Sequence, residues 1–349
     1  MKRKHGLPRT GVRTFIVTPR AKRVAVALLL LIAIGSAAAL MHGPVVRALA
    51  RTGNPLYDLD KAAWVWDATL IAPPSPKEAG NGQAPFLDRL RELNIVRVFL
   101  NAGWEKTVSG SYLAAKPEQY DQFIKAAGAR KIAVEALFGE PSFAKADHWA
   151  DLARHVNLVL EYNRLHANRF SALHLDIEPY GCADYKGNEA RILSEYLAAL
   201  QKVKDMVVQH NQENRDRVRL VLDLPVWWDA QNPKVNGQPL VPQLLQLADE
   251  VVVMNYTTDA REFIERGKRW LNAAAASKAT VTMGLEFQPE VRGATLSALT
   301  KEDVATFMRT AWQEFRINKQ FSGFAVHHFG PFNDYCRAQA RRAGTTSPR

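Results

Sequence analysis

Three polar side chains alternate along one apolar stretch of the chain: His174, Asp176 and Glu178 within residues 170–180. Alternate side chains of a β-strand share a face, so these three would point one way and the apolar residues between them the other. Buried charges are costly unless they are paired, so packing alone does not explain such a stack. Two neighbouring carboxyls disfavour each other's ionisation, which can raise one pKa into the range of a general acid. The stretch predicts acid–base chemistry, with a structural hydrogen-bond network as the alternative.

Aromatic and further polar residues follow short β-rich runs elsewhere in the sequence. Five of the eight Trp residues stand at such positions. Sugar rings stack on flat apolar faces while their hydroxyls bind polar groups, so aromatic rings beside carboxylates suit a carbohydrate. We therefore predict a glycan-binding site. For any single tryptophan, the alternative is that its ring covers the end of the apolar core. The expected substrate-binding residues are Trp66, Trp104, His174, Tyr180, Asp223, Trp228 and Asn255.

Eight such β-rich runs alternate with amphipathic segments of helical spacing. Strand–helix alternation implies parallel strands joined by right-handed crossovers. Eight units fit a single (β/α)8 TIM barrel, in which functional residues lie at the carboxyl ends of the strands. The expected fold is therefore an α/β TIM barrel that gathers the residues above at one end. The predicted strands are 62–66, 95–102, 131–139, 170–180, 219–228, 250–256, 280–288 and 321–329.

Residues 171–178 resemble the strand-four signature D-x-x-D-x-D-x-E of glycoside hydrolase family 18, the chitinase-like family. The last two acidic positions match, whereas Ser and His stand at the first two. Residues 254–256, Met-Asn-Tyr, are similar to the M-x-Y that strand six of this family often carries. The resemblance implies that Glu178 is the acid, that Asp176 orients the acetamido group of the substrate, and that Tyr256 holds the reacting centre. It also implies a hydrolase acting on an N-acetylated glycan.

A second resemblance leads to a different partner for Glu178. Residues 177–179 keep the Glu-Pro of the N-E-P that ends strand four in the retaining barrel glycosidases of the clan that includes cellulases, and Glu286 follows at the predicted end of strand seven. This resemblance implies Glu178 as acid/base and Glu286 as nucleophile. A barrel that binds glycan without cleaving it is a further alternative, because Ser171 and His174 depart from the family 18 signature. His174 would serve as a polar partner in place of the missing Asp.

The positive charge of the chain is concentrated at its beginning. The formal net charge is +11, but residues 1–41 hold eight Lys or Arg and no acid, which leaves 38 basic and 35 acidic residues elsewhere. So little excess charge argues against a nucleic-acid-binding face on the folded part. Residues 24–41 carry no charge and would span about 27 Å as a helix, enough for a bilayer core. Because the cations precede this stretch, the barrel is expected on the extracytoplasmic, periplasmic side.

The expected organisation has five parts. A cleaved signal peptide, and hence a secreted protein, is the alternative to an uncleaved membrane anchor. Cys182 and Cys336 either form a disulfide in an oxidising compartment or remain two small buried thiols. No phosphate-binding glycine motif and no H-x-H or H-E-x-x-H occurs, so neither cofactor nor metal is expected. The parts are a basic cytoplasmic segment 1–23, the anchor 24–41, a linker 42–60, the barrel 61–338 and a flexible tail 339–349.

Overall fold

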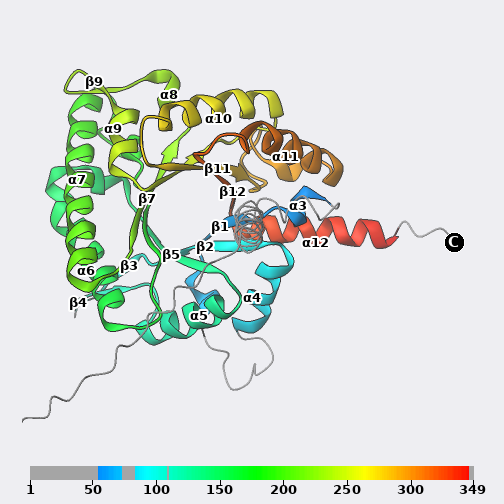
Figure 1. Cartoon of the computed structure of the whole chain (residues 1–349), viewed down its shortest axis with the longest axis horizontal. Helices are drawn as coiled ribbons and strands as arrows, with labels where there is room; N and C mark the ends of the chain where they lie inside the picture. The colour runs from blue at the N-terminus through cyan, green and yellow to red at the C-terminus, as the bar shows by residue number, and fades with distance from the viewer. Residues whose placement is uncertain (1–53, 73–82, 108–109, 346–349) are drawn as a thin grey trace, which may run out of the picture. The chain divides into compact units, whose positions relative to one another are not determined.

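The computed structural model describes residues 54–72, 83–107 and 110–345 of the chain. Eight parallel strands close into a barrel in the order β1-β12-β11-β10-β7-β6-β5-β2 (Figure 1). The predicted TIM barrel is therefore confirmed, and each of the eight predicted strands overlaps one strand of the barrel. The strands are β1 Lys61–Val65, β2 Ile95–Asn101, β5 Ala133–Phe138, β6 Ala172–Leu175, β7 Arg219–Pro225, β10 Glu250–Met254, β11 Thr280–Glu286 and β12 Phe321–His327.

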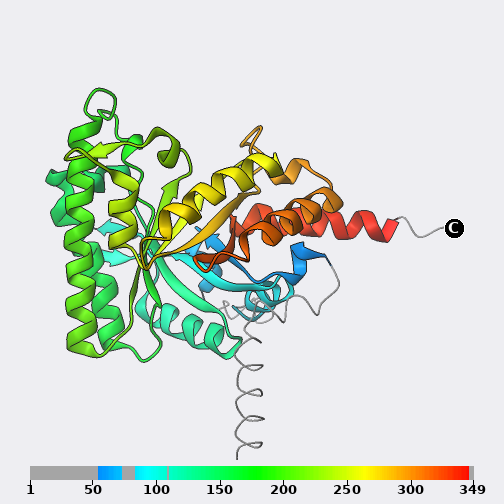
Figure 2. The same cartoon turned by 45° about the horizontal axis from the view of Figure 1, so that its top comes forward.

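Helices surround the strands, as the two views in Figures 1 and 2 show. Side-chain caps begin several of them: Asp259 accepts from the backbone N–H of Glu262 at the start of α10, and Thr300 accepts from that of Asp303 at the start of α11. The helices are α3 Pro55–Asp58, α4 Gln83–Glu92, α5 Pro117–Ala129, α6 Trp149–Leu165, α7 Glu189–Asn214, α8 Trp228–Gln231, α9 Leu240–Leu247, α10 Ala260–Ala274, α11 Lys301–Phe315 and α12 Phe329–Thr345. Two short antiparallel hairpins, β3 Trp104–Thr107 with β4 Gly110–Leu113 and β8 Lys234–Val235 with β9 Gln238–Pro239, are inserted in loops.

The ends of the folded part differ from the expected boundaries. The short helix α3 lies within the segment predicted as a linker, and its Leu56 is fully buried. The tail predicted from 339 onward is helical up to Thr345, because α12 packs its apolar face on the barrel through Phe332, whose ring centroid lies 4.8 Å from that of Phe287. The predicted anchor 24–41 lies outside the described residues. Among the described helices, none combines the length and apolarity needed to cross a bilayer.

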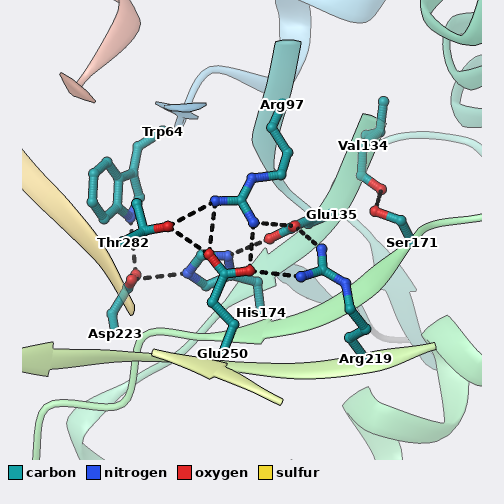
Figure 3. A network of polar contacts seen from close by, with 10 residues as sticks. All are labelled: Trp64, Arg97, Val134, Glu135, Ser171, His174, Arg219, Asp223, Glu250 and Thr282. Atoms are coloured by element: carbon teal, nitrogen blue, oxygen red, sulfur yellow. Dashed lines mark hydrogen bonds and ion pairs between the residues drawn. The ribbon is translucent and has the colours of Figure 1, made fainter. Parts of the chain in front are cut away.

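The barrel interior alternates apolar and polar layers along its axis. A ring of small and large apolar side chains fills the middle: Ala62, Trp64, Phe99, Leu137, Ala172, Val221, Val252 and Ala325. Ion pairs occupy the amino-terminal half of the strands, and acidic residues occupy their carboxyl ends. The strand predicted over 170–180 is shorter in the structure, because β6 ends at Leu175. His174 lies on β6 and bonds side chains of the two neighbouring strands, whereas Asp176 and Glu178 follow the strand. Figure 3 shows these polar contacts at close range.

Candidate active site

Asp176 is fixed at the end of β6 by a close backbone contact with β5. Its N–H donates to the carbonyl of Phe138 at 3.0 Å. A Cβ added to Gly139 would lie only 1.9 Å from the carbonyl oxygen of Asp176. Only glycine allows two backbones to approach so closely. The sequence at the end of β5 thus determines where the acid at the end of β6 sits.

The Asp176 carboxyl lies among other acids and is mostly enclosed. Its Oδ1 is buried without a hydrogen-bond partner. Burial, followed by the negative charges of Asp223 and Glu178, raises the pKa of Asp176 well above its usual range, and these effects outweigh the opposing charge of His174. The protonated form of Asp176 is therefore favoured more than in an exposed carboxyl. Its free oxygen can still form a hydrogen bond with an incoming group.

Glu178 opens onto a cleft of about 680 Å³ at the carboxyl end of the barrel. The hydroxyl of Tyr180 donates to Glu178 Oε1 and so fixes the carboxyl against the cleft wall. Burial and the bond to Glu178 raise the pKa of Tyr180, so its phenol stays neutral. The ring of Trp227 is 41% exposed and lies 5.2 Å from that of Tyr180 in an edge-on contact. An acid beside an exposed aromatic face is an arrangement that suits a sugar ring.

Tyr256 shares the cleft with Glu178 and is placed there by a glycine of β11. A Cβ on Gly284 would lie 2.9 Å from the carbonyl of Val253 and 3.1 Å from a ring carbon of Tyr256, so glycine leaves room for the ring. Burial, followed by the charges of the carboxyls around it, of which Glu286 acts most strongly, raises the pKa of Tyr256 well above its usual value. Its hydroxyl is therefore a neutral donor that faces the acids.

Glu286, in contrast, is held on both oxygens by the protein itself. It is 2% exposed, and its Oε1 accepts from the N–H of Gln288 at 2.7 Å. Its Oε2 lies 2.9 Å from Nδ1 of His327, whose Nε2 lies 3.4 Å from the indole Nε1 of Trp66. Because the indole can only donate, His327 accepts from Trp66 and donates to Glu286. His327 thus links Trp66 and Glu286 on the side of the barrel opposite β6.

Several residues predicted to bind substrate are instead enclosed, and their expected roles are corrected. Trp228 is 1% exposed and packs edge-on against Tyr196, with ring centroids 6.2 Å apart, so its neighbour Trp227 presents the exposed ring. Asn255 is fully buried and its Nδ2 donates to the carbonyl of Phe263 at 2.9 Å, which fastens α10 to β10. His174 and Asp223, exposed by 0% and 1%, bond each other.

The remaining predicted residues have simpler outcomes. Trp66 is partly buried against the apolar ring of the barrel. Trp104 begins β3, and its side chain lies outside the described part of the structure. Both cysteines are free thiols: Cys182 Sγ donates to the carbonyl of Pro141 at 3.0 Å, and Cys336 is a buried residue of α12. Within the described ranges, no three His, Cys, Asp or Glu side chains are placed to hold a metal ion.

Sequence reasoning missed three residues of this site. Trp227 stands next to the predicted Trp228; β7 ends at Pro225, and the turn that leads into α8 exposes Trp227 and buries Trp228. His327 was recognisable as a polar residue at the end of the last strand. Glu135 sits on β5 in the same alternating position as the other inward residues, so its charge in an apolar run was the available signal.

Solved structures of similar fold complete this picture. A family 18 chitinase from Cycas revoluta in complex with (GlcNAc)3 superposes with a TM-score of 0.52 at 12% identity, covering 82% of this chain and 99% of the chitinase. The same chitinase in complex with allosamidin superposes with a TM-score of 0.51 at 12% identity, covering 82% of this chain and 99% of the chitinase. The glycoside hydrolase domain of PgaB (BpsB) from Bordetella bronchiseptica superposes with a TM-score of 0.50 at 14% identity, covering 81% of this chain and 98% of that domain.

The fold is that of family 18 glycoside hydrolases. The resemblance inferred from the strand-four residues is thereby confirmed for the architecture of the chain over most of its length. No protein-family model and no curated protein matches the sequence. At identities this low, the shared fold does not carry over any particular substrate, so function has to be argued from the side chains.

Proposed function

We propose that the chain is a glycoside hydrolase that cleaves an N-acetylated glycan, with Glu178 as general acid and base. One observation carries the proposal: Glu178 opens onto the cleft that Tyr256 also lines, and Asp176 lies beside it. These are the three positions at which the sequence resembles the family 18 motifs. A cleft at the carboxyl end of a TIM barrel is where enzymes of this fold act.

Each of the three side chains has a role that its surroundings permit. Glu178 gives a proton to the leaving oxygen as the glycosidic bond breaks, and later takes one from water. Asp176 bonds the acetamido group of the substrate through its unpartnered oxygen, which orients that group toward the anomeric carbon. The neutral hydroxyl of Tyr256 donates to the same reacting centre. Trp227 provides the flat face on which a neighbouring sugar ring stacks.

The fold neighbours support the substrate class. Their titles describe a chitinase in complex with (GlcNAc)3 and with (GlcNAc)4, and a glycoside hydrolase domain. Because acetamido participation needs an N-acetyl group on the sugar before the cleaved bond, we infer a glycan containing N-acetylhexosamine. The precise linkage would depend on contacts along the cleft rather than on the catalytic acids.

Glu286 is less suited to act as a nucleophile than the alternative resemblance implies. A nucleophilic carboxylate needs an oxygen facing the anomeric carbon. Both oxygens of Glu286 are bonded, one to a backbone N–H and one to His327, and the residue is 2% exposed. These contacts favour a positioning role for Glu286, as a support for His327 and Trp66, over direct attack.

We also propose that the enzyme works outside the cytoplasm, tethered by residues 24–41. The support comes from the sequence: an uncharged stretch of 18 residues that follows eight cations. Cleavage after this stretch would release the barrel as a secreted protein instead. Export of a fusion to alkaline phosphatase, together with the mass of the mature N-terminus, distinguishes a retained anchor from a cleaved signal.

The test uses N-acetylglucosamine tetramers and fully deacetylated tetramers with the full-length chain. We expect hydrolysis of the acetylated substrate, measured as new reducing ends by chromatography and mass spectrometry, and little hydrolysis of the deacetylated one. Asp176→Asn should then be nearly as damaging as Glu178→Gln. Three results would instead support the double displacement through Glu286: equal cleavage of both substrates, an inactive Glu286→Gln variant, and covalent labelling of Glu286 in the wild type by an activated fluorosugar. Binding of the tetramer without turnover would identify a glycan-binding barrel.

A further inference from the structure

His174 lies between two carboxylates at the centre of the barrel. Its Nδ1 is 2.9 Å from Glu135 Oε2, and its Nε2 is 2.8 Å from Asp223 Oδ1 (Figure 3). A carboxylate accepts hydrogen bonds and cannot donate them, so both ring nitrogens must carry a hydrogen. His174 is fully buried, so its ring has no contact with bulk solvent. The geometry therefore describes an imidazolium ion, where the family 18 signature has a carboxyl.

The charges around His174 balance only when it is positive. Arg97 bonds Glu250 through both terminal nitrogens, at 2.5 and 2.7 Å, and Arg219 bridges Glu250 at 2.6 Å and Glu135 at 2.5 Å. These two arginines offset these two glutamates. Asp223 has no arginine of its own, and His174 supplies the sixth charge. Without it the barrel would enclose an uncompensated carboxylate, which is strongly destabilising.

The titration of His174 agrees with this balance. Burial alone would lower the pKa of His174, but the charges and hydrogen bonds of Asp223 and Glu135 outweigh it and raise the pKa to about 9. Asp223 is fixed on its other oxygen as well, because the indole Nε1 of Trp64 donates to Oδ2 at 2.9 Å. Donors thus occupy both oxygens of Asp223.

Asp176 lies two residues after His174, directly beyond the end of β6 at Leu175. Its pKa is raised by burial and by the fixed charge of Asp223. A proton on Asp176 cannot pass inward, because each nitrogen of His174 already carries one. The titratable groups that interact electrostatically with these two side chains are Glu135 of β5, Asp223 of β7, Glu178 after β6, Tyr196 of α7 and Tyr256 after β10. Tyr180 contacts Glu178. The ion pairs among Arg97, Arg219 and Glu250 lie one contact further away, through Glu135.

Resting on the proposed function, we propose that His174 is a positioning residue: its imidazolium holds Asp223 as a carboxylate, and this fixed charge keeps one proton on Asp176 in the resting site. The catalytic proton is thereby confined to the outer carboxyls, Asp176 and Glu178. The family 18 signature has a carboxyl at the place of His174, and that carboxyl could share the proton. His174 cannot accept it, because both of its ring nitrogens already carry a hydrogen. The chain therefore reaches a protonated Asp176 by a different arrangement of charge.

The decisive variant is the double substitution His174→Gln with Asp223→Asn. It removes one cation and one anion together, so the barrel stays neutral, and the two amides can bond each other. His174→Gln alone leaves Asp223 unpaired and is expected to lower the melting temperature, which the double variant should largely restore. Ser171→Ala is the matched control, because the hydroxyl of Ser171 donates to the carbonyl of Val134, at 3.1 Å, and to none of the charged side chains of this network.

The readout is the protonation of Asp176 in the full-length protein. Infrared absorption of a protonated carboxyl, assigned by its loss in Asp176→Asn, is followed from pH 4 to 10. We expect the midpoint in the double variant to fall, because the removed charge of Asp223, which raises the pKa of Asp176, outweighs the removed charge of His174, which lowers it. The alkaline limb of kcat/KM on the N-acetylglucosamine tetramer should move with it. Ser171→Ala should keep the wild-type midpoint.

Two results would overturn the proposal. A double variant that regains its stability and keeps the wild-type midpoint would reduce His174 to a structural role. A neutral His174 in the wild type at pH 7, seen in the ¹⁵N shifts of its ring, would do so without any variant. Absence of hydrolysis together with the expected infrared shift would instead refute the proposed function and leave the protonation scheme in place.

Discussion

The two ends of the same barrel strands carry polar layers of different kinds. Toward the amino ends, every charged side chain among Arg97, Arg219, Glu135 and Glu250 has an oppositely charged partner within 3.4 Å. At the carboxyl ends, Asp176 has an unpartnered oxygen and Glu178 opens onto a cleft. Matched charges hold a structure together, whereas unmatched ones are available for chemistry. The difference suggests that substitutions in the two layers will separate cleanly into losses of stability and losses of activity.

The largest expected effect is at the unmatched end. Glu178→Gln keeps the size of the side chain and can still accept from Tyr180, but an amide cannot deliver a proton. We expect hydrolysis of the N-acetylglucosamine tetramer to fall by about 10²–10⁴-fold, the usual contribution of a positioned acid. The melting temperature should change no more than it does when an exposed residue is substituted. Activity close to that of the wild type would refute both catalytic schemes, since each needs this carboxyl.

The matched end should behave in the opposite way. Glu250→Gln leaves Arg97 and Arg219 with an uncompensated charge, and we expect a loss of about 3–5 kcal/mol in the free energy of unfolding. The control is Glu161→Gln, which breaks an exposed ion pair with Arg164. It should change the free energy of unfolding by less than about 1 kcal/mol. Denaturant titrations measure both. Equal effects would mean that burial does not separate the two layers.

Acid titration sharpens the same test. Burial alone would raise the pKa of Glu250, but Arg97 and Arg219 outweigh it and lower the pKa from 4.5 to about 2. A carboxyl whose pKa is lowered by folding stabilises the fold above its unfolded pKa and loses that contribution as the pH falls. The wild type should therefore lose stability between about pH 4.5 and 2. Glu250→Gln should lack this part of the pH dependence.

The sequence predicted one of these layers better than the other. His174 could be placed facing the barrel interior because strand alternation is a local property. The pairing of Arg97 with Glu250 could not, because 153 residues separate them and the contact depends on the stagger of strands around the closed barrel. The strands themselves were predictable from their apolar runs. Side chains just beyond a strand were not, because alternation ends where the turn begins.

Gly139 tests how finely the unmatched layer is positioned. Gly139→Ala would force the Asp176 backbone to move, because the new Cβ would start 1.9 Å from its carbonyl oxygen. A misplacement of about 1 Å can cost about 10²-fold in rate, so we expect a loss of that order in kcat. Gly128→Ala on α5 makes the same chemical change with nothing within 4 Å of the new Cβ and should keep full activity. Equal kcat in the two variants would show that β5 does not position the acid.

The smallest effect expected is at the cleft wall, where two adjacent tryptophans differ. Trp227 is 41% exposed, whereas Trp228 is 1% exposed beyond the end of β7. Trp227→Ala should weaken tetramer binding by about 1–3 kcal/mol, the scale for losing a large apolar contact, and leave the melting temperature near that of the wild type. Trp227→Phe should recover part of the affinity, since it keeps an aromatic face. Trp228→Ala should act on stability instead, by about 3–5 kcal/mol, because it empties a buried volume. Calorimetry of binding and of unfolding separates these outcomes. If Trp227→Ala binds the tetramer as the wild type does, the sugar does not lie on this ring, and the cleft wall that positions it must be sought on the side of Trp66 and His327.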